Sequence, residues 1–94
     1  MIKYLIERYL VKAFCEEIKY GLSLYSCERE YQMRKDGNRY IVIFKSTQTN
    51  GEGNSTVIRR KLKIIPRQLL LLTNQNMSDI IHYIDGRSDS YVRC

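Results

Sequence analysis

Apolar side chains recur every three or four residues over the first part of the chain, and charged side chains occupy the opposite positions. This spacing predicts a helix over residues 2–20 with one face packed on a core. Gly21 is placed to end the helix in a left-handed conformation, with Leu22 as its hydrophobic contact. The expected buried face consists of Ile2, Leu5, Ile6, Tyr9, Leu10, Ala13, Phe14 and Ile18.

The apolar period changes to two at Leu24, which is typical of a β-strand with one buried face. Asp36 and Gly37 then precede a second run with strand character, residues 39–45. An Asp-Gly pair is a strong hairpin signal, because a type I′ turn needs two positive φ angles. With this pair at the turn centre, the expected cross-strand partners are Met33 with Tyr40, Tyr31 with Val42, and Arg29 with Phe44.

Residues 47–56 are polar and contain Gly51 and Gly53, so we expect a flexible exposed loop. A third strand is predicted over residues 57–65. Its even positions, mostly apolar, are expected to face the core, and its odd positions carry cations. The inward positions are Ile58, Arg60, Leu62 and Ile64.

Pro66 ends the third strand, because it lacks an amide donor and restricts the residue before it. The next segment, residues 67–73, fits either a short buried strand or, with the proline at its first position, the first turns of a helix. Ser78 or Asn76 can cap a final helix that stops at Gly86.

These elements predict an α+β fold, with an antiparallel sheet of three to four strands and the N-terminal and C-terminal helices packed on one face. Residues 1–86 are expected to form a single domain, and residues 87–94 a flexible C-terminal tail. A chain of 94 residues buries roughly 60–65% of its unfolded surface, which supports one core. Because this core is small, a partner chain can form part of the fold, for example a second copy in a homodimer.

The longest unbroken apolar run, residues 69–72, is too short to span a membrane, and no secretion signal is recognisable. Cys15, Cys27 and Cys94 are an odd number of cysteines without metal-ligand spacing. They argue against a disulfide framework and a zinc site, and they favour a reducing, cytoplasmic compartment. Cys15 and Cys27 are expected to pack in the core.

Catalytic chemistry finds little support. His82 is the only histidine, which restricts metal sites and nucleophile–histidine pairs to that residue. Glu28 with Glu30, and Glu16 with Glu17, are paired carboxylates on exposed faces without an evident cleft. We therefore expect no enzyme, no metal site and no cofactor.

Eight tyrosines invite a base-stacking interpretation, since nucleic-acid-binding sheets use exposed aromatic rings. The pattern argues against it. Tyr9, Tyr25, Tyr31 and Tyr40 fall on predicted inward faces, so we expect most tyrosines in the core.

Residues 51–55 have the pattern Gly-x-Gly-x-Ser within an α-β-β-β-α order, which resembles a double-stranded-RNA-binding domain over residues 10–72. The resemblance implies that Ser55 opens a basic helix. The chain departs from the family after this serine, where the expected lysine pair is missing. Pro66 would also interrupt the helix, at a cost of about 3 kcal/mol, so the strand interpretation is preferred.

The net charge of +6 and the pI near 9.4 make polyanions the first partners to consider. In the predicted register, cations gather on the sheet face that lacks helices, with Ile41 and Ile43 among them. The expected phosphate contacts on and beside this face are Arg34, Arg39, Lys45, Arg59, Arg60, Lys61, Lys63 and Arg67.

The sequence thus predicts a small basic, non-enzymatic protein that binds nucleic-acid phosphates and has no membrane partner. The alternative is a virus- or mobile-element-encoded protein that binds and inhibits or modulates a host protein. Richness in Ile, Lys, Tyr and Asn, a bias of AT-rich coding sequence, suggests such a source. The expected protein contacts are Ile41, Ile43, Gly51 and Gly53.

Overall fold

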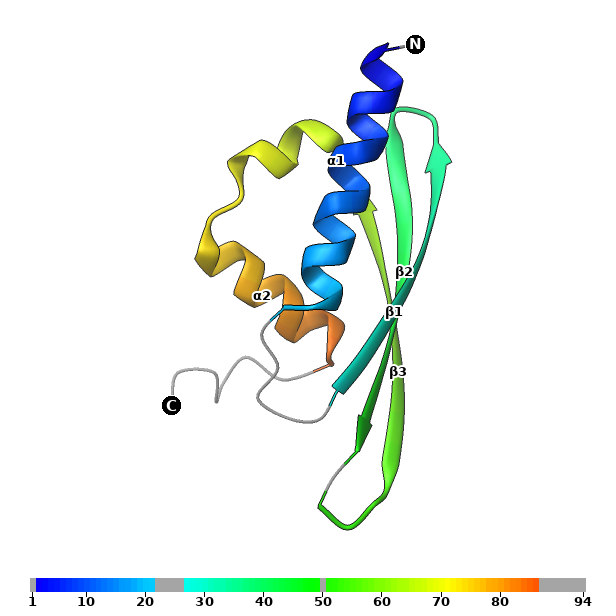
Figure 1. Ribbon diagram of the computed structural model, residues 1–94, viewed down its shortest axis with the longest axis vertical. Helices are drawn as coiled ribbons and strands as arrows, with labels where there is room; N and C mark the ends of the chain where they lie inside the picture. The colour runs from blue at the N-terminus through cyan, green and yellow to red at the C-terminus, as the bar shows by residue number, and fades with distance from the viewer. Residues whose placement is uncertain (1, 22–26, 50, 87–94) are drawn as a thin grey trace.

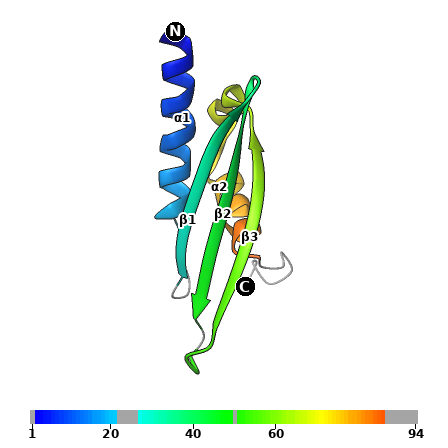
Figure 2. The ribbon, with the colours of Figure 1, turned by 90° about the vertical axis from the view of Figure 1, so that its right-hand side faces the viewer.

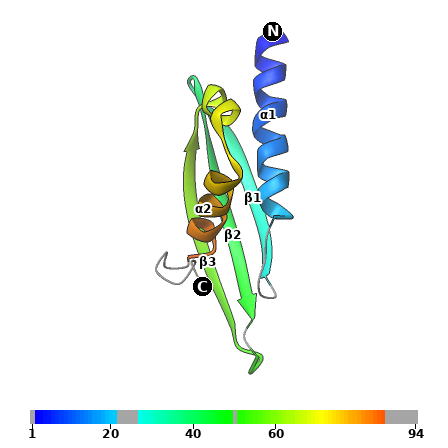
Figure 3. The same ribbon diagram turned by 90° about the vertical axis from the view of Figure 1, so that its left-hand side faces the viewer.

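The computed structural model describes residues 2–21, 27–49 and 51–86 and has the predicted α+β architecture (Figure 1). Its elements, in chain order, are α1 (Ile2–Lys19), β1 (Cys27–Asp36), β2 (Arg39–Thr49), β3 (Ser55–Ile64), the 3₁₀ helix η1 (Pro66–Leu71) and α2 (Asn74–Ile84). The strands form one antiparallel sheet in the order β1-β2-β3. All helical elements lie on one side of it (Figures 2 and 3).

Helix α1 buries only part of the predicted face, because Phe14 and Ile18 lie in the core as expected but other members do not. Leu5, Ile6 and Tyr9 were expected in the core, but they are 62%, 53% and 70% exposed. Side chains two residues apart on a helix differ in direction by about 200°, so Tyr9 points nearly opposite to Val11. The prediction had merged apolar residues from two sides of the helix into one face. The buried inner face consists of Val11, Phe14, Cys15 and Ile18.

Gly21 follows α1 for a reason that the sequence did not reveal. Its φ angle is not positive, so the predicted left-handed ending is wrong. A Cβ atom at this position would lie 2.6 Å from Ile81 Cδ1 and 3.0 Å from the Glu17 carbonyl oxygen. The close approach of α1 to α2 therefore requires glycine here. Leu22, the predicted hydrophobic contact, lies outside the described residues.

The β1–β2 hairpin turns at Gly37 and Asn38, one residue later than predicted. Tyr31 pairs with Phe44, two residues further along β2 than expected, and all the predicted pairs shift in the same way. Gly37 has a φ of 67° and Asn38 has no positive φ, which fits a type II′ turn. The predicted turn would have forced Asp36 into the left-handed region. Because a shift of two residues preserves the side-chain direction, the predicted strand faces are unchanged.

Both ends of the segment predicted as a loop, residues 47–56, extend the sheet instead. Strand β2 continues to Thr49 and β3 begins at Ser55, so this hairpin projects beyond the helices (Figure 1). The threonines in the segment favour strands, and the glycines alone suggested a longer loop. Ser55 opens a strand and not the helix implied by the resemblance to a double-stranded-RNA-binding domain.

The helical alternative is correct for the segment after Pro66, which forms η1 with the proline in its first turn. Helix α2 begins earlier than predicted, because its cap is Thr73 and neither Ser78 nor Asn76. The Asn76 amide donates a hydrogen bond of 3.2 Å to Thr73 Oγ1. Gly86, with a φ of 72°, follows the helix at its end, as predicted.

The core lies between the sheet and the helices. Cys15 is completely buried in it. Burial, assisted by the nearby Glu16 carboxylate, raises the pKa of this thiol to about 12. The thiol therefore stays protonated at neutral pH and acts as a packing residue, as predicted. The buried cluster consists of Val11, Phe14, Cys15, Ile18, Tyr40, Val42, Phe44, Ile64, Ile81 and Ile84.

The tyrosines divide between core and surface. Tyr40 is buried and Tyr31 is half-buried, as predicted, whereas the exposure of Tyr9 contradicts its prediction. The Tyr31 hydroxyl donates a hydrogen bond to Glu16, and burial together with this bond raises the pKa of Tyr31. Tyr25 lies outside the described residues. Within the described ranges, no helix is both long and apolar enough to cross a bilayer.

Candidate functional site

The face of the sheet turned away from the helices carries the predicted cations, and we call it the open sheet face. Figure 2 views the molecule from this side, with α2 behind the strands. Strand alternation places the even residues of β1 and the odd residues of β2 and β3 on it. Three cross-strand rows lie across its middle: Arg34–Ile41–Lys63, Gln32–Ile43–Lys61 and Glu30–Lys45–Arg59.

Lys45 and Arg59 are direct cross-strand partners on this face. Like charges directly opposite each other destabilise a sheet, so this pair has a local electrostatic cost. Glu30, opposite Lys45 on β1, offsets part of it. The three side chains border a polar depression of about 240 Å³, to which Tyr31, Gln32 and Ile43 also contribute. An anion bound between the two cations would relieve their repulsion.

Strand β3 adds a column of cations to the open sheet face. Arg59, Lys61 and Lys63 are all exposed and alternate along the strand. Their spacing gives a column roughly 13 Å long. Over that length of its axis, a B-form duplex has about four phosphates in each strand. Within the part of the chain that the structure describes, none of these three side chains forms an ion pair.

Arg34 and Arg39 complete the cations of this face, and both are exposed. Arg39 Nε lies 4.0 Å from Asp36 Oδ2, with both side chains about half exposed to solvent. Such exposed pairs contribute little stability and leave the guanidinium accessible. Glu28 and Glu30 are the other acidic residues here. Positive charge therefore predominates on the open sheet face.

Two predicted phosphate contacts lie elsewhere. Arg60 points to the helix side, where its Nε donates a hydrogen bond of 3.2 Å to the Tyr83 carbonyl oxygen. Its guanidinium also lies 5.6 Å from the Tyr83 ring centre. Arg67 is exposed on η1, on the helix side of the sheet (Figure 1). Arg60 therefore points away from the cationic face beside which it was expected.

Only one of the two isoleucines predicted as apolar contacts on the open sheet face is exposed. Ile43 is 42% exposed, but Ile41 is only 5% exposed. Ile41 lies between Arg34 and Lys63, whose aliphatic stems are long enough to cover it. Val57, which was not predicted as a contact, is 49% exposed on the same face.

Gly51 and Gly53 are exposed at the tip of the β2–β3 hairpin. Strand pairing separates this tip from the Lys45–Arg59 pair, because the β2–β3 ladder continues to Thr49. The two glycines therefore do not share one site with Ile43.

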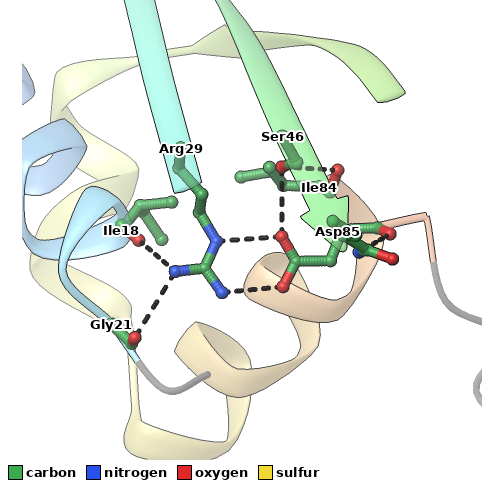
Figure 4. Close-up of polar contacts among 7 residues, drawn as sticks. Ile18, Gly21, Arg29, Ser46, Ile84 and Asp85 are labelled. Carbon is green, nitrogen blue, oxygen red and sulfur yellow. Dashed lines mark hydrogen bonds and ion pairs between the residues drawn. The ribbon is translucent and has the colours of Figure 1, made fainter. Parts of the chain in front are cut away.

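A buried polar cluster joins both helices to the sheet, and sequence reasoning missed it (Figure 4). Arg29 donates hydrogen bonds from Nε to Asp85 Oδ1 (2.9 Å) and from Nη2 to Asp85 Oδ2 (2.7 Å). Both side chains are almost completely buried. Arg29 Nη1 also lies 3.4 Å from the carbonyl oxygens of Ile18 and Gly21 at the end of α1.

Strand β2 completes this cluster. The Ser46 hydroxyl donates to Asp85 Oδ1 over 3.1 Å, and Gln48 Nε2 donates to the Asp85 carbonyl oxygen over 2.7 Å. The sequence contained one indication of this cluster, because Arg29 is a charged residue at a strand position that faces the core. Because the cluster is closed to solvent and internally satisfied, we assign it a structural role.

Residues 2–21, 27–49 and 51–86 hold the histidine and the paired carboxylates considered for catalytic chemistry. They contain no group of three or more histidine, cysteine or acidic residues placed to hold a metal ion. His82 is half-buried, and its Nδ1 has no hydrogen-bond partner among the described residues. Glu28 and Glu30 are exposed on a strand.

Comparison with known proteins returned no match for the chain among protein-family models, curated proteins or solved structures.

Proposed function

We propose that this protein binds nucleic acid through its phosphates, using the open sheet face, and that it has no catalytic activity. The observation that carries the proposal is the direct pairing of Lys45 with Arg59 beside the column of β3 cations. A folded protein retains repulsion of this kind at a cost in stability. A polyanion that lies along β3 converts the cost into a favourable interaction and releases counterions.

The proposed contacts are sequence-independent. Lysine and arginine side chains on a sheet surface reach phosphates and carry no base-specific information by themselves. The residues proposed to contact phosphates are Arg34, Arg39, Lys45, Arg59, Lys61 and Lys63.

We expect affinity for single- and double-stranded DNA and RNA to fall steeply with salt, because each neutralised phosphate releases counterions. Three to five contacts give a slope of log K against log salt of roughly −3 to −5. Fluorescence anisotropy with labelled oligonucleotides at several salt concentrations measures this slope. Absence of binding at low salt, or a flat salt response, would refute the proposal.

A matched pair of variants locates the contact in the same assay. Lys61→Gln on β3 should reduce the magnitude of the slope by about 1, because one phosphate contact is lost. Lys12→Gln removes the same charge from an exposed position on α1 and should leave the slope unchanged. Equal effects of both variants would show that only net charge matters and would argue against this site.

A protein target is the second candidate, and the exposure of Ile43 and Val57 among the cations favours it. Apolar residues surrounded by charge suit a protein interface. Strand β3 is also an edge of the sheet, where an extended segment of a partner can pair.

If a protein is the target, capture by the tagged chain should survive nuclease treatment. Val57→Asp should abolish the capture, because it places a charge within the contact. Tyr83→Asp, at a similarly exposed position on α2, should leave it intact. A partner that is lost with nuclease supports the nucleic-acid proposal instead.

A further inference from the structure

Helix α1 has a second apolar side, opposite its buried inner face. Leu5, Ile6 and Tyr9 lie within about 100° of one another around the helix axis and are all more than half exposed. Helix η1 contacts α1 and lies beside it (Figures 1 and 3). It adds Leu70 and Leu71, which are 74% and 76% exposed. We call these five residues the outer apolar surface.

A helix with apolar residues on opposite sides is typical of one buried between two layers. The sheet of the same chain supplies one layer for α1, against Val11 and Ile18. The outer apolar surface exposes about 500 Å² of apolar side chain, which is near the largest patch of an ordinary monomer. Two such patches together bury about 1,000 Å², the lower size limit of a specific interface.

The charges around α1 favour a second copy as the occupant. The helix carries both signs, whereas the cation excess lies on the open sheet face, on the other side of the molecule. Two α1 helices therefore approach each other without the repulsion expected from a net charge of +6 per chain. The charged residues of α1 are Lys3, Glu7, Arg8, Lys12, Glu16, Glu17 and Lys19.

We propose that a second copy of this chain docks on the outer apolar surface and forms a symmetric dimer in which the two α1 helices pack together. A twofold contact brings the same patch of both copies together, so each apolar residue of the patch is buried in both chains. Both open sheet faces remain uncovered in this arrangement. The inference is therefore independent of the proposed nucleic-acid binding.

Sedimentation equilibrium over a range of protein concentrations tests the dimer. We expect a monomer–dimer equilibrium for the unaltered chain. Ile6→Lys and Tyr9→Lys should each raise the dimer Kd by at least about tenfold, because they place unpaired charges within the contact. Both positions are exposed in the monomer, so circular dichroism should show an unchanged fold.

Val57→Lys is the matched control, since it adds the same charge at an exposed apolar position on the open sheet face. It should leave the Kd unchanged. A chain that remains monomeric at the highest concentration would overturn the proposal, as would equal weakening by Val57→Lys. A monomer that instead cosediments with anionic phospholipid vesicles, and loses this binding with Tyr9→Lys, would overturn it in favour of a membrane surface.

Discussion

Replacing Asp85 with alanine is expected to lower the free energy of unfolding by about 3–5 kcal/mol, the largest effect among these predictions. The substitution leaves the Arg29 guanidinium buried without the carboxylate that receives two of its hydrogen bonds. It also removes the closer of the two acceptors of the Ser46 hydroxyl, leaving the Ile84 carbonyl oxygen at 3.4 Å. A buried charge without its partner is far more costly than the loss of an exposed pair.

Urea unfolding followed by circular dichroism measures this effect. Asp36→Ala is the matched control, because it removes the carboxylate of the exposed contact with Arg39 and should cost no more than about 0.5 kcal/mol. Adding Arg29→Met to Asp85→Ala should recover part of the loss, since the orphaned charge is then absent. A cost for Asp85→Ala as small as that of the control would contradict a structural role for the cluster.

Gly86→Ala is expected to lower the free energy of unfolding by about 2–4 kcal/mol, for two separable reasons. Gly86 has a φ of 72°, a left-handed conformation that alanine adopts only with strain. An added Cβ would also lie 2.8 Å from Ile58 Cδ1 and 3.1 Å from Ile58 Cγ2. The second effect crowds the contact between the end of α2 and β3.

Gly53→Ala separates these two costs. Gly53 has a φ of 85°, but no atom lies within 4 Å of where its Cβ would be, so its variant should lose only about 1–2 kcal/mol. In a chain that already carries Ile58→Ala, the further loss caused by Gly86→Ala should fall toward that of Gly53→Ala, because the crowding partner is absent. Equal losses in Gly53→Ala and Gly86→Ala, measured by urea unfolding, would show that crowding contributes nothing.

The proposed nucleic-acid site and the proposed dimer contact lie on opposite sides of the molecule. A variant of one should therefore leave the other unchanged. Lys61→Gln should weaken the salt dependence of nucleic-acid binding without changing the dimer Kd. Tyr9→Lys should weaken the dimer while the open sheet face of each chain stays intact. A dimer would still increase the apparent affinity for a long polyanion, since two linked faces bind with a higher effective concentration.

The sequence by itself determined the α+β class, the extent of α1 and the side of the sheet on which Lys45, Arg59, Lys61 and Lys63 lie. These features depend on local periodicity, which is written directly in the order of residues. The error of two residues in the β1–β2 register did not affect them, because strand faces repeat every second residue. Most of the candidate site was therefore predictable.

Only the tertiary structure decided which apolar side of α1 is buried. The helix has two apolar sides, and the sheet and the other helices pack against one of them. The tertiary structure also decided that Arg60 binds the end of α2, that Ile41 is covered while Ile43 is exposed, and that Arg29 meets Asp85. These outcomes depend on contacts between residues far apart in the chain. Local pattern carries no information about such contacts, because the same side chain is stable on a surface or beside a distant partner.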